Sequence, residues 1–304
     1  MTVLVFGSLN LDLVAYADEL PSLGQTVTGK KLLRFPGGKG LNQAIAARRS
    51  GSEVLMVGCL GRDVEGDFLN QILVDEKIDS RFISRQQIQT GIAVIEVSKE
   101  AENRILIIPG ANALVKYEEQ YLKVPTQPKV VLAQLETPIT EVEEFIVNAH
   151  KSGVITILNP APIQKLSPML ISACDHLIVN ETEASFLTGA AVEKLSKSQA
   201  QEISQQLLAQ GAKRVVITLG DQGSLYADEQ REIYTPAFKV SPVDTTAAGD
   251  AFCGAYATAL ANGSSIEYCL KFATAAGAIA AKRAGAVPSL PTRDEILSML
   301  TSLE

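Results

Sequence analysis

The sequence predicts a three-layer α/β protein. Its mainly parallel central sheet carries helices on both faces, and a small second β-sheet is added to it. Short apolar runs alternate with helical segments of about a dozen residues, the pattern of strands joined by helical crossovers. Most of these runs end in polar or glycine residues, as strands do where a parallel sheet binds a ligand. Residues 13–35 interrupt the alternation with β pattern and no helix.

The main sheet is expected to contain the short apolar runs, and these lie at 3–6, 54–57, 130–135, 154–158, 177–179 and 214–219, with an antiparallel edge pair at 224–226 and 232–234. Helical patterns cover residues 41–49, 65–77, 139–152, 248–262, 265–284 and 293–302. The second sheet is expected at 13–16, 26–35, 92–97 and 104–108, with residues 98–103 as a hairpin connection. We therefore expect an α/β domain of residues 1–12, 36–90 and 109–304, and a β unit of residues 13–35 and 91–108.

Composition narrows the class of protein. The 304 residues are 46% hydrophobic and 20% charged, which is ordinary for a folded soluble chain. The net charge of −7 argues against a nucleic-acid or anionic-membrane partner. The four cysteines form no CxxC pair, and two histidines are too few for a His-rich metal centre. The chain begins with strand pattern and has no run long enough to span a membrane, so we expect a cytoplasmic protein.

Residues 244–254 (DTTAAGDAFCG) combine small residues with a carboxylate at the start of a predicted helix. The first N–H groups of a helix have no partner within it and carry partial positive charge, so they attract anions. Ala248 and Gly249 let such an anion approach the backbone. From these residues alone, Asp250 is either a helix cap or a catalytic base.

Polar residues recur where predicted strands end, and they should meet at one edge of the sheet, where the Asp250 helix also begins. They are Asn10, Asp12, Glu136, Asn159, Asn180, Glu183 and the loop at Gly220. Asn and Asp also favour plain turns, so turn formation is the alternative. The glycine-rich segment 36–40 serves as a hinge, as a ligand contact through Lys39 and Asn42, or as both.

Segments 37–44 (GGKGLNQA) and 244–250 (DTTAAGD) resemble the ribokinase-like family of sugar and nucleoside kinases. The resemblance extends over essentially the whole chain, at 7–12, 134–136, 159–162, 180–183, 218–223 and 285–289. It implies transfer of the γ-phosphoryl group of ATP to O5 of D-ribose, giving D-ribose 5-phosphate and ADP. The alternatives are another sugar or nucleoside (2-deoxyribose, fructose or pseudouridine), or a non-catalytic sugar or nucleotide sensor.

The resemblance also implies roles for individual residues. Asp250 is the general base, and the backbone N–H groups of Ala248, Gly249 and Asp250 form an anion hole. The sugar is expected at Asn10, Leu11, Asp12, Gly38, Lys39, Gly40, Leu41, Asn42, Glu136 and Asp250. ATP is expected at Asn180, Thr218, Leu219, Gly220, Asp221, Gln222, Gly223, Gly249, Asp250 and Thr274.

Two cofactors are implied in the same way. Mg²⁺ accompanies ATP and is held through water near Asn180 and Glu183. K⁺ activates the enzyme, with the expected ligands Asp244, Thr246, Ala280, Arg283, Gly285 and Ser289. From the residues alone, Asp244 is as well explained as a turn cap and Gly285 as a helix end. The second β unit is implied to be a lid over the sugar, hinged near Gly37 and Gly38, and we expect a homodimer through it.

Overall fold

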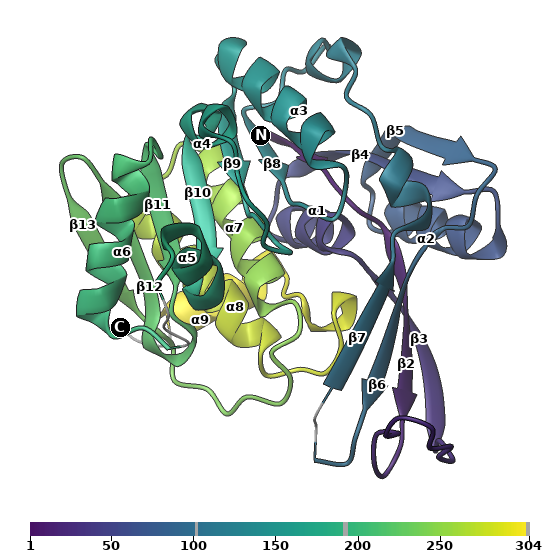
Figure 1. The fold of residues 1–304 in the computed structure, drawn as a ribbon. Coiled ribbons are helices and arrows are strands. Elements are labelled where there is room, and N and C mark those ends of the chain that lie inside the picture. The colour runs from purple at the N-terminus through teal and green to yellow at the C-terminus, as the bar shows by residue number, and fades with distance from the viewer. Residues whose placement is uncertain (101–102, 191–193, 302–304) are drawn as a thin grey trace.

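The computed structural model describes residues 1–100, 103–190 and 194–301. A central sheet carries helices on both faces, and a separate four-stranded sheet projects from one end of the molecule (Figure 1). The predicted fold class is therefore confirmed. Among the described residues, no helix has the length and apolar character needed to cross a membrane.

The central sheet has nine strands in the order β13-β12-β11-β10-β9-β8-β1-β4-β5. They are β1 (Thr2–Phe6), β4 (Glu53–Gly61), β5 (Asp79–Gln86), β8 (Val130–Ala133), β9 (Ile155–Leu158), β10 (His176–Asn180), β11 (Arg214–Thr218), β12 (Gly223–Asp228) and β13 (Glu232–Pro236). The strands from β11 to β5 in this order pair in parallel, whereas β12 and β13 form the predicted antiparallel edge.

Nine α-helices occur in the described part of the chain: α1 (Lys39–Arg49), α2 (Val64–Asp75), α3 (Ile139–Lys151), α4 (Pro168–Ala173), α5 (Glu181–Thr188), α6 (Lys197–Ala209), α7 (Ala248–Ala261), α8 (Ile266–Ala280) and α9 (Arg293–Thr301). Short 3₁₀ turns lie at η1 (Gly110–Leu114), η2 (Glu119–Leu122), η3 (Gly220–Gln222) and η4 (Val287–Ser289).

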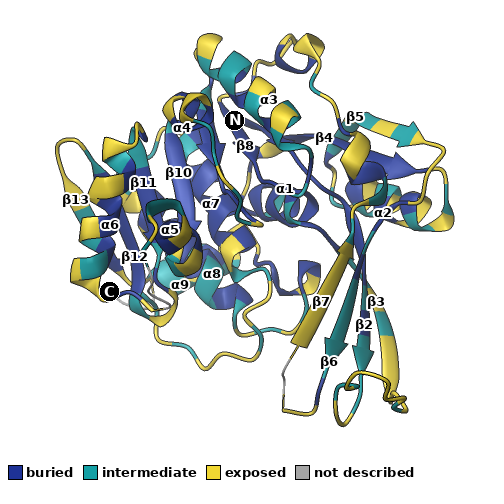
Figure 2. Cartoon of the chain, viewed as in Figure 1, coloured by how far each residue is buried: buried dark blue, intermediate teal, exposed yellow. Residues whose placement is uncertain are grey.

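Alternating side chains of the strands point to opposite faces, so the sheet separates two cores (Figure 2). Val3 and Val5 of β1 join the core under α1, α2, α7, α8 and α9. Leu4 and Phe6 join the core under α3 to α6. Helix α7 packs closely on α1, because a Cβ on Gly254 would lie 2.5 Å from the Cβ of Ala46.

The second sheet has the order β3-β2-β6-β7, formed by β2 (Asn10–Tyr16), β3 (Lys31–Gly37), β6 (Gly91–Val97) and β7 (Asn103–Ile108). Its strands differ from the prediction at their ends. Strand β2 already starts at Asn10, which pairs with Gly37 of β3 and Gly91 of β6. Residues 26–30 are not in a strand. The hairpin of β6 and β7 is confirmed, and its predicted connection includes residues 101 and 102, which lie outside the described residues.

Several elements carry too weak a pattern to predict. Strand β5 (DSRFISRQ) is mixed in polarity because it is a half-exposed edge strand. Helices α4, α5 and α6 were not expected, and α6 is rich in Gln and Ser. Helix α8 ends at Ala280, four residues before the predicted end, and residue 302 of the last predicted helix lies outside the described part.

Candidate active site

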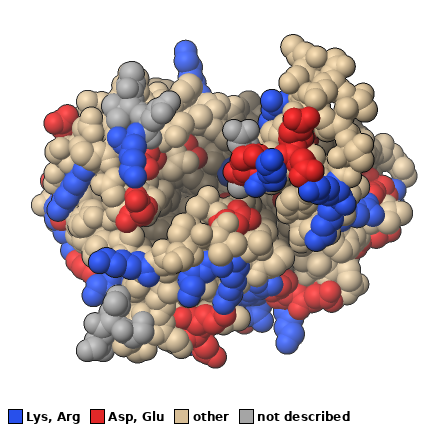
Figure 3. Space-filling model, turned by 90° about the horizontal axis from the view of Figure 1, so that it is seen from below, with Lys and Arg blue, Asp and Glu red and all other residues tan. Residues whose placement is uncertain are grey.

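Two adjoining cavities lie where β10 and β11 end and α7 begins. The larger has a volume of about 460 Å³ and the smaller about 200 Å³, and both are lined by Thr218, Thr245 and Gly249. The arrowhead of β10 points towards the side of the molecule viewed in Figure 3, where the surface is hollowed near its centre. This is the strand edge at which the sequence predicts a ligand site.

The start of α7 leaves backbone donors available at the junction of these cavities. Its N-cap residue, Ala247, has a left-handed backbone (φ 58°) and no side-chain cap. The N–H of Ala248 was expected to be free, but it donates to the carbonyl of Thr245 at 3.2 Å. No described residue accepts from the N–H of Gly249 or Asp250. A Cβ on Gly249 would meet no atom within 4 Å, which shows open space above these donors.

Two neighbouring amides on α1 hold the buried Asp250 carboxylate. Nδ2 of Asn42 donates to one oxygen and Nε2 of Gln43 donates to the other, both at 2.9 Å. Gln43 also donates to Oδ1 of Asn159 at 3.1 Å and accepts from Gln134 at 2.6 Å. Oδ1 of Asn42 is buried without a partner among the described atoms, so it can accept from a ligand hydroxyl.

Lys39 adds a positive charge to the smaller cavity, which Asp250, Asn180 and Glu183 also line. Burial opposes its charge, but the carboxylates of Asp250, Glu136 and Glu183 raise the pKa of the Lys39 ammonium above its usual value. Glu183 forms a capping box with Asn180 at the start of α5. Burial raises the pKa of the Glu183 carboxyl, while the Asn180 backbone and Lys39 lower it.

Glu136 and Asp12 form an acidic group beside Asp250. One oxygen of Glu136 accepts from the hydroxyl of Ser8 at 2.5 Å, from the N–H of Lys39 at 3.0 Å and from Nδ2 of Asn10 at 3.5 Å. Burial raises the pKa of Asp12 to about 7, with further contributions from the charges of Glu136 and Asp250. The carboxyl of Asp12 is therefore partly protonated near neutral pH.

The glycines after β3 allow close approach of backbone segments. A Cβ on Gly37 would lie 2.1 Å from a carboxyl oxygen of Asp12, and Gly38 has φ 90°. A Cβ on Gly40 would lie 2.4 Å from the backbone nitrogen of Ser8. Gly40 therefore lets the start of α1 dock on the loop after β1.

Some predicted contact residues are part of the core. Leu11 and Leu41 are buried side chains, and so is Leu219. These three residues line neither of the two cavities. Gln222 points elsewhere, since its amide donates to the carbonyl of Leu195 at 2.9 Å. These four were expected as contacts because they lie inside motifs.

The larger cavity is lined by most of the residues expected for ATP, namely Thr218, Gly220, Asp221, Gly223, Gly249 and Thr274. Its apolar wall includes Phe238, Val240 and Pro242, which the sequence analysis did not single out. Gln43 and Asn112 were missed as well. Asn112 donates to Oδ1 of Asn10 at 2.7 Å and accepts from the N–H of Leu9 at 2.9 Å, so it fixes the start of β2.

Asp244 connects the segment before α7 to the segment after α8. Its carboxylate accepts from the N–H of Thr246 at 2.8 Å and from the N–H of Gly285 at 2.9 Å. Burial works against the charge, but these hydrogen bonds hold the pKa of Asp244 below its usual range. Ser289 donates to the carbonyl of Ala286 at 2.7 Å, and the carbonyl of Ala280 accepts from the N–H of Arg283 at 3.0 Å. No three acidic, His or Cys side chains cluster as metal ligands within the described residues.

Comparison with known proteins agrees with this geometry. Residues 2–293 match the model of the pfkB family carbohydrate kinases. The chain is 38% identical to a ribokinase of Haemophilus influenzae, with 98% of each chain covered. It is 31% identical to a deoxyribokinase of Salmonella typhi, with 99% of each covered. The structure of Arabidopsis thaliana ribokinase complexed with ribose and ATP superposes with a TM-score of 0.88 at 31% identity, over 98% of each chain.

The family match covers nearly the whole chain, and the identity to curated relatives extends over the same length. The chain belongs to the pfkB family of carbohydrate kinases and is an enzyme that transfers a phosphoryl group to a sugar hydroxyl.

Proposed function

We propose that the protein phosphorylates D-ribose at O5 with ATP, giving D-ribose 5-phosphate and ADP. The observation that carries the proposal is the buried Asp250 carboxylate. It lines the smaller cavity, held by two amides, beside free N–H groups of a helix start at which Gly249 lines both cavities. Ribokinase relatives and the relative complexed with ribose and ATP support the choice of substrates.

Asp250 accepts the proton of the attacking hydroxyl, as a general base within hydrogen-bond reach of the sugar. The N–H groups of Gly249 and Asp250 stabilise the charge of the transferring phosphoryl group. The N–H of Ala248 joins them once its 3.2 Å bond to Thr245 opens. The ammonium of Lys39 adds positive charge to the smaller cavity. Phosphoryl transfer needs mainly such positioning and charge stabilisation.

The acidic group beside Asp250 suits a polyol. A sugar presents several O–H donors, and Asp12, Glu136 and the unpartnered Oδ1 of Asn42 offer acceptors. The relative named a deoxyribokinase makes 2-deoxyribose the main alternative substrate. Fructose, pseudouridine and other nucleosides are further alternatives. A non-catalytic sensor is disfavoured by the intact base and helix start.

Mg²⁺ and K⁺ fit the oxygen-rich groups that the chain offers. Asn180 and Glu183 line the smaller cavity, and Glu183 already accepts from Asn180, so they suit a Mg²⁺ held through water. When bound, Mg²⁺ neutralises charge on the ATP phosphates. Asp244, with the carbonyls of Thr246, Ala280, Arg283 and Gly285 and the hydroxyl of Ser289, would hold K⁺ behind the start of α7. Replacing KCl by NaCl should then lower turnover, and equal turnover in both salts would contradict the K⁺ site.

The four-stranded sheet is proposed as a lid over the sugar and as the contact of a homodimer through two lids. Its edge strand β7 exposes Ile105 (58%) and Leu106 (63%), and Leu32 of β3 is 64% exposed. Apolar side chains on an edge strand favour pairing with a second copy. A molar mass in solution equal to that of one chain at micromolar concentration would contradict the dimer.

The substrate assignment is tested by ADP release from the pure protein with ATP, Mg²⁺ and K⁺. We expect release that depends on D-ribose and a kcat/KM for D-ribose above that for 2-deoxyribose, fructose or nucleosides. Sugar-independent release would contradict the kinase assignment. Higher kcat/KM for another member of the panel would replace ribose by that substrate.

A further inference from the structure

A third cavity, of about 670 Å³, lies at the opposite end of the central sheet from Asp250. His176 and Arg214, which begin β10 and β11, line it, whereas Asn180 and Thr218, which end these strands, line the active-site cavities. At about 3.3 Å per residue, the length of β10 separates the two ends by about 13 Å. No residue lines both this cavity and the active-site cavities, so a ligand here is separate from sugar and ATP.

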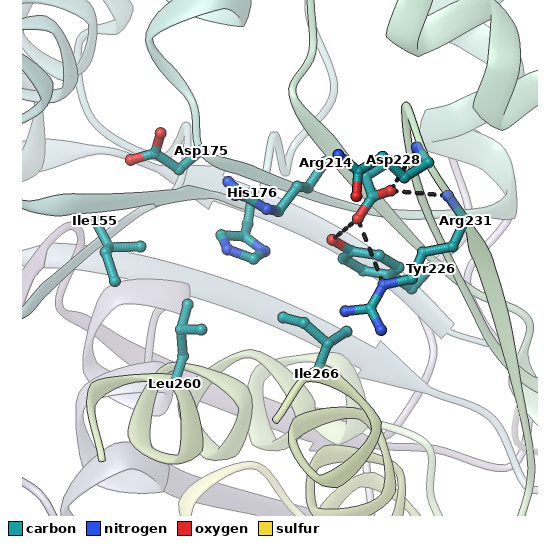
Figure 4. Close-up of a pocket in the computed structure, with 10 residues that line it drawn as sticks. Ile155, Asp175, His176, Arg214, Tyr226, Asp228, Arg231, Leu260 and Ile266 are labelled. Atoms are coloured by element: carbon teal, nitrogen blue, oxygen red, sulfur yellow. Dashed lines mark hydrogen bonds and ion pairs between the residues drawn. The ribbon is translucent and has the colours of Figure 1, made fainter. Parts of the chain in front are cut away.

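Arg214 begins β11, where it lies opposite Asp228 of β12 in the antiparallel register. None of the described residues forms a hydrogen bond or ion pair with its guanidinium. His176 begins the neighbouring strand β10, and its side chain lies next to that of Arg214 in the cavity (Figure 4). A guanidinium presents a planar set of N–H donors that suits a carboxylate.

His176 offers a second donor. The side chain is 3% exposed, and its Nδ1 lies 3.0 Å from the hydroxyl of Tyr256 on α7. Burial, together with the charge of Arg214, lowers the pKa of His176 to about 3, so the imidazole is neutral. We assign the Tyr256 hydroxyl as the donor to Nδ1, and this assignment places the proton of the neutral imidazole on Nε2. No hydrogen bond within the described chain uses Nε2.

The acidic groups of the cavity wall are already paired. Asp175 accepts from Lys213 and from the N–H of Thr156, both at 3.0 Å. Asp228 accepts from the hydroxyl of Tyr226 at 2.6 Å, and Arg231 donates to Glu267 at 2.8 Å. Arg214 is therefore the charged side chain of the wall that forms no hydrogen bond or ion pair with the described residues. Because two carboxylates stand in the wall, a monoanion fits this charge better than a dianion.

The rest of the wall combines the polar side chains of Gln230 and Arg231 with an aliphatic group. Leu260 and Ile266 lie across the cavity from His176 and Arg214, Ile155 lies beside His176, and the ring of Tyr226 forms the other side (Figure 4). The volume of this cavity lies in the range of sites for small organic molecules, and its aliphatic group provides an apolar surface beside the polar one.

We propose that this cavity binds a small organic monocarboxylate with an apolar body. The carboxylate accepts hydrogen bonds from the Arg214 guanidinium and from Nε2 of His176. The apolar body packs against Leu260, Ile266 and the ring of Tyr226. Helix α7 contributes Leu260 to this cavity and Asp250 to the active site, so the bound acid contacts the same helix that carries the proposed base.

Sodium benzoate is a suitable probe, and the chain has only two histidines, so the imidazole NMR signals report on the site directly. We expect saturable shifts of the His176 signals with benzoate. Arg214→Gln should weaken binding about tenfold or more, the effect of losing a charge-assisted hydrogen bond. Arg62→Gln is the matched control, because Arg62 is exposed, lines none of these cavities and loses the same charge. It should bind benzoate as the parent protein does.

Benzyl alcohol, which lacks the charge, should bind more weakly than benzoate, and inorganic phosphate should not displace benzoate. The absence of saturable His176 shifts, or equal benzoate affinity of Arg214→Gln and the parent, would overturn the proposal. Phosphate that competes as well as benzoate would overturn the choice of an apolar carboxylate. If Arg214→Gln fails to fold, Arg214→Lys retains the charge and loses the planar fork. Binding as tight as in the parent would then overturn the role of Arg214.

Discussion

Gln43 gives the sharpest test of how the proposed base is held. Its amide donates at 2.9 Å to one oxygen of Asp250, and the side chain is fully buried. In Gln43→Met, a side chain of similar length replaces the amide, so this oxygen loses its donor while the Asn42 bond to the other oxygen remains. The carboxylate should then rotate away from the orientation that faces the sugar.

A buried hydrogen bond to a charged group contributes about 1.5–3 kcal/mol. If that energy orients Asp250 for proton transfer, its loss lowers kcat by about 10- to 150-fold, at about 1.4 kcal/mol per factor of ten. KM for the sugar should change much less, because the acceptors Asp12 and Glu136 remain. The assay is steady-state ADP release at saturating ATP, with thermal unfolding measured in parallel.

Thr258→Val is the matched control. Thr258 is buried on α7 and donates to the carbonyl of Ala47 on α1 at 3.0 Å, so it also joins these two helices. Its loss should lower stability by about 1 kcal/mol and leave kcat nearly unchanged. Gln43→Met also loses the bonds to Asn159 and Gln134, so its loss of stability should exceed that of the control. A kcat of the folded Gln43→Met variant within about twofold of the parent would refute a positioning role for Gln43.

Three further predictions concern the same site. Asp250→Asn should lower kcat by about 10²- to 10⁴-fold, the usual contribution of a general base, and retain sugar binding by calorimetry; near-normal turnover would make the base assignment wrong. The pKa of Asp12 is raised from 3.8 to about 7, so the folded state binds the extra proton and stability is lost as pH rises from about 4 to 7. The test is the difference in the free energy of urea unfolding between Asp12→Asn and the parent. This difference should grow in favour of the variant by roughly 3 kcal/mol from pH 5 to pH 8, and a difference that does not change with pH would contradict the raised pKa. Gly249→Ala should retain or raise the melting temperature, since the new Cβ meets no atom, and it should weaken turnover by filling the space beside the free N–H groups. Gly40→Ala should lower the melting temperature, because its Cβ would collide with the backbone of Ser8.

The sequence predicted the parts of the site that local patterns encode. Asn180 and Glu183 follow a strand, and Asp250 begins a helix of small residues, so their common location follows from the rules of parallel sheets. Gln43 carries no such signal, because its bond to Asp250 joins residues 207 positions apart. The apolar wall at Phe238 belongs to an irregular segment, whose path depends on tertiary packing and not on a periodic pattern.

The same limit explains the errors in the fold. Strand β5 and helix α6 lack a strong periodic pattern, since a half-exposed edge strand and a polar surface helix need few apolar residues. Strand β2 starts at Asn10 because that residue pairs with two strands that are distant in sequence. Pairing of this kind has no trace in the local sequence around Asn10.

The order of the strands has a consequence for folding during synthesis. From β8 to β13, each strand pairs with the one made just before it, so this half of the sheet can assemble as the chain leaves the ribosome. Helix α1, in contrast, packs against α7, whose last residue, Ala261, is made 212 residues after Arg49. At a synthesis rate of about 5–20 residues per second, α7 becomes available to cover the apolar face of α1 only after roughly 10–40 s. During that interval the nascent chain presents an uncovered apolar helix face to chaperones and to neighbouring chains.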